Sequence, residues 1–178
     1  MQFRYDTLIR LINENNLKVG AEIGVKRGEN VTKVLTACPD FVFHAIDCWD
    51  PKLQYINWTK GAQVVNEQFF NRKLRHFPGR LIKHKGYSVP VSDEFENESL
   101  DLIFIDGDHE YIGCVADIIA WLPKLKFGGF LCGHDYGHPR FPGVKQAVDE
   151  YLPAVEVFGD MTWVFKKELK DEVAEEKI

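Results

Sequence analysis

The sequence contains little cysteine, and none of it is arranged as a metal or disulfide motif. Four cysteines stand in 178 residues, at positions 38, 48, 114 and 132, and no two have C-x-x-C spacing. This usage is typical of free thiols in a reducing compartment and argues against a disulfide framework. Cys132 lies within an apolar run, so we expect its side chain to be buried.

Long apolar runs and a surplus of positive charge are also absent. No apolar run approaches the ~18 residues that a membrane-spanning helix needs, and residues 1–16 lack the apolar core of a signal peptide. We therefore predict a cytoplasmic protein without a membrane partner. The net charge is −5, with 22 Lys and Arg against 27 Asp and Glu. Because a nucleic-acid partner needs a basic face, we expect none, and we interpret the basic residues in 72–85 as a solvated surface.

The composition favours one globular domain over residues 1–178. Of the residues, 45% are hydrophobic and 28% charged, and a chain of this length buries about 70% of its unfolded surface. We expect an N-terminal helix within 1–17, a substrate-side insertion at 50–78 and a charged tail at 167–178. The aromatic residues Trp49, Tyr55 and Trp58 are open to two readings, a lid over a substrate or ordinary core packing.

Apolar periodicity predicts strands that alternate with helices. Leu8, Leu11 and Ile12 have helical spacing. Further helices are predicted at 31–36 with Asn30 as N-cap, and at 64–70, 111–122 and 144–152. Strands are predicted at 18–24, 41–46, 80–85, 100–105 and 130–133, with a turn at 126–129 and a closing hairpin of 155–158 and 162–165. This order predicts an α/β fold: a Rossmann-like, doubly wound, mostly parallel seven-stranded sheet with an antiparallel C-terminal edge strand.

The first strand runs into a turn with two glycines, Glu22-Ile23-Gly24-Val25-Lys26-Arg27-Gly28. Glycine allows a tight turn and the close approach of a ligand. The middle glycine of the dinucleotide fingerprint is missing, which disfavours a pyrophosphate and therefore a nicotinamide dehydrogenase. Asp47 ends the second strand, where an acid accepts hydrogen bonds from ribose hydroxyls. Together these residues indicate a nucleoside ligand without a pyrophosphate.

Two later strands end in polar clusters. The first cluster follows residue 105 and the second follows residue 133; their members are Asp106, Asp108, His109 and Glu110, then His134, Asp135 and His138. Parallel strands end at one edge of a sheet, so we expect the clusters to face one crevice and to suit a divalent cation. For Asp108, an N-cap role at the following helix is the alternative. We expect Asp117 at a helix surface.

The turn Glu22-x-Gly24-x-x-x-Gly28 resembles motif I of the class I S-adenosylmethionine-dependent methyltransferases. Asp47 resembles the ribose-binding acid of that family, and Gly86-Tyr87-Ser88 resembles the loop that flanks the adenine. The runs 105–111, 121–123, 128–129 and 133–136, together with Asp117, resemble one small subgroup, the macrocin-type (macrolide-sugar) O-methyltransferases. The likeness covers roughly residues 18 to 152.

This resemblance implies S-adenosyl-L-methionine as cofactor and a small polar molecule as methyl acceptor. The implied cofactor-binding residues are Glu22, Gly24, Val25, Gly28, Asp47, Cys48, Tyr87, Ser88, Asp106 and Gly107. Such relatives commonly carry two adjacent acids after the fifth strand, and here the first of that pair is His134. The implied ligands of a divalent cation are therefore Asp106, His134 and Asp135. Histidine suits manganese or zinc better than magnesium, and a site without a metal is the alternative.

O-methylation needs a hydroxyl held in line with the sulfonium methyl group and a base to remove its proton. We predict His109 or His138 as that base, with Asp106 and Asp135 orienting the hydroxyl or a cation. Two alternatives are a metal-dependent hydrolase built on the same Asp/His clusters and a non-catalytic nucleoside-binding module. The sequence leaves open whether the chain forms a homo-oligomer.

Overall fold

The computed structural model describes residues 3–52 and 61–168. Within these residues a seven-stranded sheet has the order β3-β2-β1-β4-β5-β7-β6. The strands are β1 Val19–Ile23, β2 Val42–Asp47, β3 Leu81–Lys85, β4 Leu100–Ile105, β5 Leu125–Gly133, β6 Glu156–Val157 and β7 Trp163–Lys166. Strands β1 to β5 pair in parallel, whereas β7 runs antiparallel to β5 and to β6. The expected fold class is confirmed, with β7 as the antiparallel strand and β6 beyond it at the edge.

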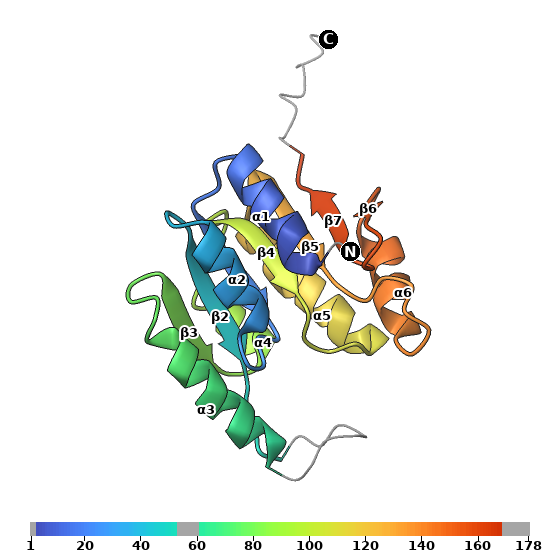
Figure 1. Cartoon of the computed structure of the whole chain (residues 1–178). Coiled ribbons are helices and arrows are strands. Elements are labelled where there is room, and N and C mark those ends of the chain that lie inside the picture. The colour runs from blue at the N-terminus through green and yellow to red at the C-terminus, as the bar shows by residue number, and fades with distance from the viewer. Residues whose placement is uncertain (1–2, 53–60, 169–178) are drawn as a thin grey trace, which may run out of the picture.

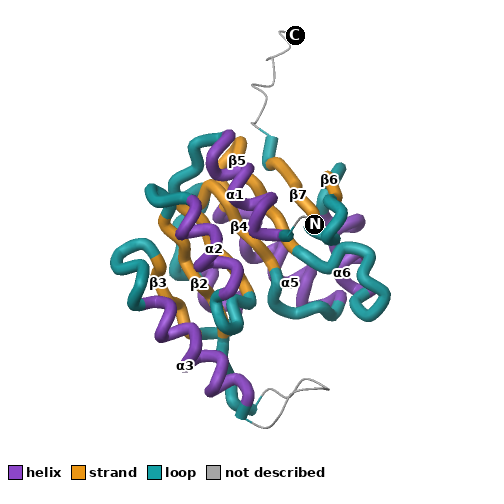
Figure 2. The backbone as a smooth tube through the Cα atoms, viewed as in Figure 1, coloured by secondary structure: helices purple, strands orange, loops and turns teal. Residues whose placement is uncertain are grey.

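Helices cover both faces of this sheet (Figures 1 and 2). One face carries α1 Arg4–Glu14, α2 Glu29–Ala37 and α3 Ala62–Leu74, and the other carries α4 Ser88–Ser92, α5 Tyr111–Trp121 and α6 Pro142–Tyr151, with a 3₁₀ turn at Leu122–Lys124. Alternating residues of the strands point into two separate apolar clusters. Phe104 of β4, for example, belongs to the first cluster, whereas Ile103 and Ile105 belong to the second. Because both faces are covered, β4 is apolar almost without interruption.

Two local predictions are wrong for identifiable reasons. Asn30 is not the N-cap of the second helix, because α2 starts at Glu29, two residues before the predicted start, and Gly28 takes the N-cap position with φ 74°. The expected turn at 126–129 lies inside β5, which is nine residues long. Gly128 adopts φ 79° there, and the pairing of β5 with β4 shifts register between Leu100 and Leu102. The glycine pair therefore marks an irregularity within a strand.

The cysteine and aromatic predictions have mixed outcomes. All four cysteines are free thiols, and Cys132 is buried as expected. Trp49 is fully buried and packs against Phe70 with the two rings tilted, so it belongs to the core. Tyr55 and Trp58 lie outside the described residues. No helix among those described is long and apolar enough to cross a membrane.

Candidate functional site

A cleft of about 1380 Å³ lies at the carboxyl ends of β1, β2, β4 and β5. This is the edge at which open α/β sheets bind ligands. Nine of the ten expected cofactor-binding residues line it: Glu22, Gly24, Val25, Asp47, Cys48, Tyr87, Ser88, Asp106 and Gly107. The tenth, Gly28, lies outside the lining at the start of α2, where an added Cβ would stand 2.9 Å from the Phe70 ring.

Gly24 brings the turn after β1 against the end of β4. It adopts φ 88°, and a Cβ at this position would lie 2.2 Å from the carbonyl oxygen of Asp106. No side chain fits in that space, so glycine is required by backbone packing as well as by backbone conformation. The contact joins the two loops that form the centre of the cleft.

Glu22 stands at the floor of the cleft and is almost fully buried. Its Oε2 accepts a hydrogen bond of 3.1 Å from Asn30 Nδ2. Burial, together with the nearby charge of Asp106, raises the pKa of Glu22 well above its usual value. The Oδ1 of Asn30 is buried without a hydrogen-bond partner among the described residues, and Asn30 lines the same cleft. A cationic or N–H-bearing ligand group would satisfy both side chains.

Asp47 shapes the loop after β2. Its Oδ2 accepts a 2.7 Å hydrogen bond from the backbone N–H of Lys26, and its Oδ1 accepts a 2.8 Å bond from that of Trp49. Burial raises the pKa of Asp47, against these two bonds, which lower it. A carboxylate has about four acceptor positions, so Asp47 keeps capacity for ligand hydroxyls.

The loop before α4 forms a further wall. The Ser88 hydroxyl accepts a 2.7 Å hydrogen bond from Trp121 Nε1, and Tyr87 donates a 2.6 Å bond to Asp50. Asp117 also lines the cleft and is only 4% exposed, so its expected surface position is wrong. Burial raises the pKa of Asp117 to about 6, against a hydrogen bond from Ser88 that lowers it. Ile112 and Ile119 of α5 are apolar but exposed, so the sequence pattern does not indicate that the side of α5 with Asp117 is the buried one.

The two polar clusters that follow β4 and β5 meet at the other end of the cleft. His109 Nε2 lies 3.0 Å from Asp135 Oδ2 and 3.8 Å from Asp106 Oδ1. Burial alone would lower the pKa of His109, but the two carboxylates outweigh it and raise that pKa to about 9. Conversely, the imidazoles hold the pKa of Asp135 below its usual range in spite of burial. In this arrangement His109 is an imidazolium that donates to Asp135.

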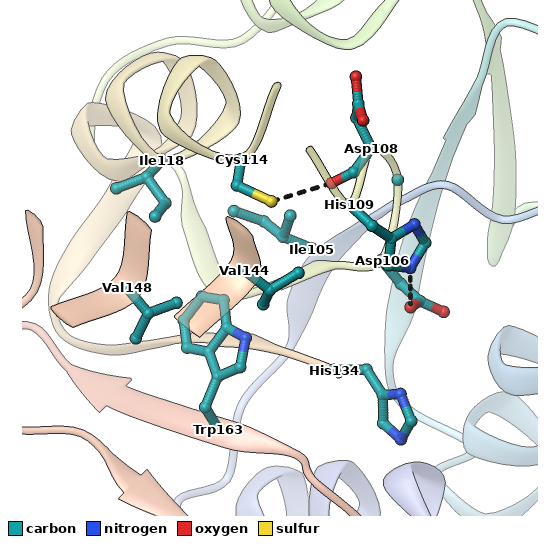
Figure 3. A pocket seen from close by; sticks show the side chains of 11 residues that line it. Ile105, Asp106, Asp108, His109, Cys114, Ile118, His134, Val144, Val148 and Trp163 are labelled. Carbon is teal, nitrogen blue, oxygen red and sulfur yellow. Dashed lines mark hydrogen bonds and ion pairs between the residues drawn. The ribbon is translucent and has the colours of Figure 1, made fainter. Parts of the chain in front are cut away.

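Three of these side chains form a donor set that suits a divalent cation. One ligand atom each from Asp106, His134 and Asp135 lie within 4.8 Å of one another. Figure 3 shows Asp106 and His109 beside each other after β4, with His134 reaching toward the same side from β5. Asp135 adopts φ 61°, a left-handed conformation that aspartate tolerates better than most residues. Two carboxylates and one imidazole suit manganese or zinc better than magnesium.

A small cavity of about 10 Å³, the size of one water molecule, lies beneath this cluster. Apolar side chains from β4, α5, α6 and β7 line it, as Figure 3 shows, and Cys114 Sγ donates a 3.0 Å hydrogen bond to the Asp108 carbonyl. Asp108 Oδ1 accepts a 2.9 Å bond from the N–H of Glu110, the N-cap residue of α5. Asp108 thus orders the loop one turn before the helix, without capping the helix itself.

His138 is separate from the carboxylate cluster. It is absent from the residues that line the cleft, and its Nδ1 accepts a 3.2 Å hydrogen bond from the backbone N–H of Arg140. Its ring stacks on Phe141 at a centroid distance of 4.9 Å, and His109 contacts the same ring at 4.4 Å. Phe141 therefore connects the two candidate bases, of which only His109 reaches the cleft.

Sequence reasoning missed Arg4 and Asn30. Arg4, in the first turn of α1, forms an ion pair with Asp106 across 102 positions of sequence. Asn30 was interpreted as a helix cap, although it faces the cleft. No local pattern marks an arginine near the N-terminus as a site residue, because its partner is brought close only by the docking of α1.

A family model described as "Methyltransferase domain" matches residues 21–136. An uncharacterized protein of Acanthamoeba polyphaga mimivirus is 31% identical over 85 residues, which are 44% of this chain and 38% of the viral protein. The matched part of this chain thus covers well under half the length of the viral protein.

Several solved structures share the fold. The O-methyltransferase NovP superposes with a TM-score of 0.69 at 18% identity, over 93% of this chain and 78% of NovP. The TDP-rhamnose 3'-O-methyltransferase of calicheamicin biosynthesis gives 0.65 at 17% identity, over 91% and 77%. The Podospora anserina methyltransferase PaMTH1, solved with S-adenosylhomocysteine bound, gives 0.66 at 16% identity, over 95% and 80%. At these identities the likeness establishes the fold.

Proposed function

Because this chain belongs to the methyltransferase domain family, we propose that it transfers a methyl group from S-adenosylmethionine to a hydroxyl oxygen of a small polar molecule. One observation carries the proposal. The turn at Glu22 and Gly24, the strand-end acid Asp47 and the cluster of Asp106, His109 and Asp135 border a single cleft. A nucleoside-binding half and a proton-transfer half are thereby joined in one space.

In this proposal the cofactor lies over the carboxyl ends of β1 and β2. Asp47 accepts hydrogen bonds from the ribose hydroxyls, and the loop at Tyr87 and Ser88 borders the adenine. The buried pair of Glu22 and Asn30 faces the cofactor's ammonium group, which would satisfy the unpartnered Asn30 Oδ1. S-adenosylmethionine supplies the activated methyl group, so the protein has only to align the acceptor and remove its proton.

We assign proton removal to His109, because it is the one of the two candidate imidazoles that lines the cleft. Asp106 and Asp135 raise the pKa of His109 to about 9, which keeps its imidazole protonated. His109 can accept a proton only when a bound divalent cation pairs with these two carboxylates in its place. The donor set of Asp106, His134 and Asp135 would hold a divalent cation. Such a cation lowers the pKa of a bound hydroxyl and orients it.

The acceptor class is a small hydroxyl-bearing molecule such as a sugar or a phenol. Supporting this class, the two named O-methyltransferases that share the fold include one that acts on TDP-rhamnose. Family membership favours methyl transfer over a metal-dependent hydrolase and over a non-catalytic nucleoside-binding module.

The test is transfer of labelled methyl from S-adenosylmethionine to a panel of sugar and phenol acceptors, with EDTA and with Mn²⁺ added back. The proposal expects label in at least one acceptor, loss of transfer in EDTA and recovery with Mn²⁺. Full activity in EDTA would remove the cation from the proposal and leave methyl transfer standing. Binding of S-adenosylhomocysteine without transfer to any acceptor would support the non-catalytic alternative.

A further inference from the structure

Arg4 places a permanent positive charge inside the candidate site. It is the first residue of α1, and its guanidinium pairs with Asp106 Oδ2. The side chain of Asp106 is only 16% exposed and that of Arg4 is 36% exposed, so the pair is partly shielded from water. The planar guanidinium of arginine matches the geometry of a carboxylate, which suits it to a partly buried ion pair of this kind.

The position of Arg4 is set by the packing of the rest of α1. Thr7, Leu8, Leu11 and Ile12 are buried, and the helix packs beside α2 on the same face of the sheet (Figure 1). In the first turn, Thr7 is buried and Tyr5 packs against the edge of the core, while Phe3, Arg4 and Tyr5 line the cleft. The ion pair with Asp106 therefore holds the first turn of α1 against the mouth of the site.

The same carboxylate is also needed by a divalent cation. Asp106 is one of the three donors that lie within 4.8 Å of one another, with His134 and Asp135. A guanidinium and a divalent cation bound to the same carboxylate would lie close together, and their positive charges would repel each other. Without a divalent cation, the carboxylates of Asp106 and Asp135 face the imidazolium of His109 and the guanidinium of Arg4. The charge of Arg4 acts on Glu22 as well as on Asp106.

We propose that Arg4 is a built-in counter-cation: it neutralises Asp106 while the site holds no divalent cation, and the incoming cation must displace it. Binding of the cation and docking of the first turn of α1 are then opposed, and by linkage each weakens the other by the same factor. Occupancy of the site thus controls how tightly residues 3–5 close the cleft. This inference rests on the cation site of the proposed function.

Calorimetric titration with Mn²⁺ alone tests the competition without any methyl acceptor. The proteins are wild type, Arg4→Gln, Arg4→Lys and a matched control, Arg10→Gln. Arg10 lies on the same helix and stacks over Phe158, so its replacement removes one positive charge from α1 away from the donor set. We expect Arg4→Gln to bind Mn²⁺ about tenfold more tightly than wild type, which corresponds to about 1.4 kcal/mol. Arg10→Gln should match wild type.

Arg4→Lys keeps the charge but loses the planar fork that pairs with a carboxylate, so its affinity should lie between those of wild type and Arg4→Gln. It also serves if the glutamine variant folds poorly, which circular dichroism would reveal. Equal Mn²⁺ affinity in wild type and both Arg4 variants would overturn the inference while leaving the cation site intact. Absence of Mn²⁺ binding in every protein would overturn the inference and the cation site together, whereas S-adenosylhomocysteine binding tests the methyltransferase assignment separately.

Discussion

Two histidines share the Phe141 ring, but only His109 borders the cleft, and they therefore make a matched pair for mutation. We expect His109→Ala to lower kcat by about 10² to 10⁴, the usual contribution of a general base. The affinity for S-adenosylhomocysteine should stay within about twofold, because His109 lies at the acceptor end. The measurement is steady-state methyl transfer to an acceptor found in the panel, together with calorimetry.

His138→Ala is the control, since it removes the second imidazole and the other stacking contact on Phe141. Its kcat should remain near that of wild type. Equal losses in both variants would mean that Phe141 positioning, and not proton transfer by His109, explains the effect. An effect confined to His138→Ala would reverse the assignment of the base.

The two loops at the centre of the site depend on the absence of a side chain at Gly24. Gly24→Ala combines an unfavourable φ of 88° with a Cβ only 2.2 Å from the Asp106 carbonyl. Gly137→Ala has a similar φ of 77° but no atom within 4 Å of the new Cβ. The left-handed conformation alone costs about 1–2 kcal/mol, and overpacking adds roughly 1–3 kcal/mol.

Urea denaturation of the two variants therefore separates conformation from packing. Gly137→Ala should lose about 1–2 kcal/mol of unfolding free energy, and Gly24→Ala clearly more, with loss of S-adenosylhomocysteine binding. Equal destabilisation would show that the contact between the two loops contributes nothing measurable.

The positions of site residues could be predicted from the sequence where those residues lie at the ends of strands. Asp47, Asp106 and Asp135 follow apolar strands, and parallel strands end at one edge, so their convergence could be anticipated. Arg4 could not, because its contact with Asp106 depends on how α1 docks. Asn30 was misread because asparagine is both a frequent helix cap and a good buried hydrogen-bond partner, and local sequence does not separate these roles.

At the scale of elements, β2 and β3 carry a histidine pair that makes stability depend on pH. His44 Nδ1 lies 2.9 Å from His84 Nε2, and His84 Nδ1 lies 2.8 Å from Glu94 Oε2. Burial, with a contribution from His84, lowers the pKa of His44 from 6.5 to about 4. The folded protein thus favours neutral His44, and this stabilisation is full above pH 6.5 and is lost as pH falls toward 4.

We expect His44→Phe to show a smaller loss of unfolding free energy between pH 6.5 and pH 4 than wild type. Allowing for the partial exposure of His44, the difference should be about 1–2 kcal/mol. The phenylalanine keeps the edge-to-face contact that His44 makes with Phe95. Parallel pH curves for the two proteins would contradict the assignment of this dependence to His44.

Regular elements were predicted well where one face is polar. α1 follows helical spacing, and the closing hairpin of β6 and β7 is marked by the polar turn between its strands. α5 was harder to orient, because Ile112 and Ile119 are exposed while Asp117 is buried. In β5, Gly128 and Gly129 look like a turn, but the pairing with β4 and β7 continues past them. Tertiary contacts override local preference in both elements.

For the whole molecule, the strand order could be inferred only as a class. Alternating strands and helices favour a doubly wound sheet. In the order β3-β2-β1-β4-β5, the direction in which successive strands are added to the sheet reverses between the parallel neighbours β1 and β4. The turn after β1 and the cluster after β4 meet at that reversal, as expected for a ligand-binding crevice. The cofactor half and the chemical half of the cleft adjoin for this reason.

Calorimetric titration with S-adenosylhomocysteine tests binding of the cofactor at this cleft. Wild type should bind one molecule per chain. Asp47→Asn should bind about tenfold more weakly, because a carboxylate that accepts hydrogen bonds is replaced by an amide. Asp40→Asn, at an exposed position before β2, removes the same charge and should bind like wild type. Absence of binding in wild type would rule out the proposed cofactor, and equal affinity in all three proteins would rule out the role of Asp47.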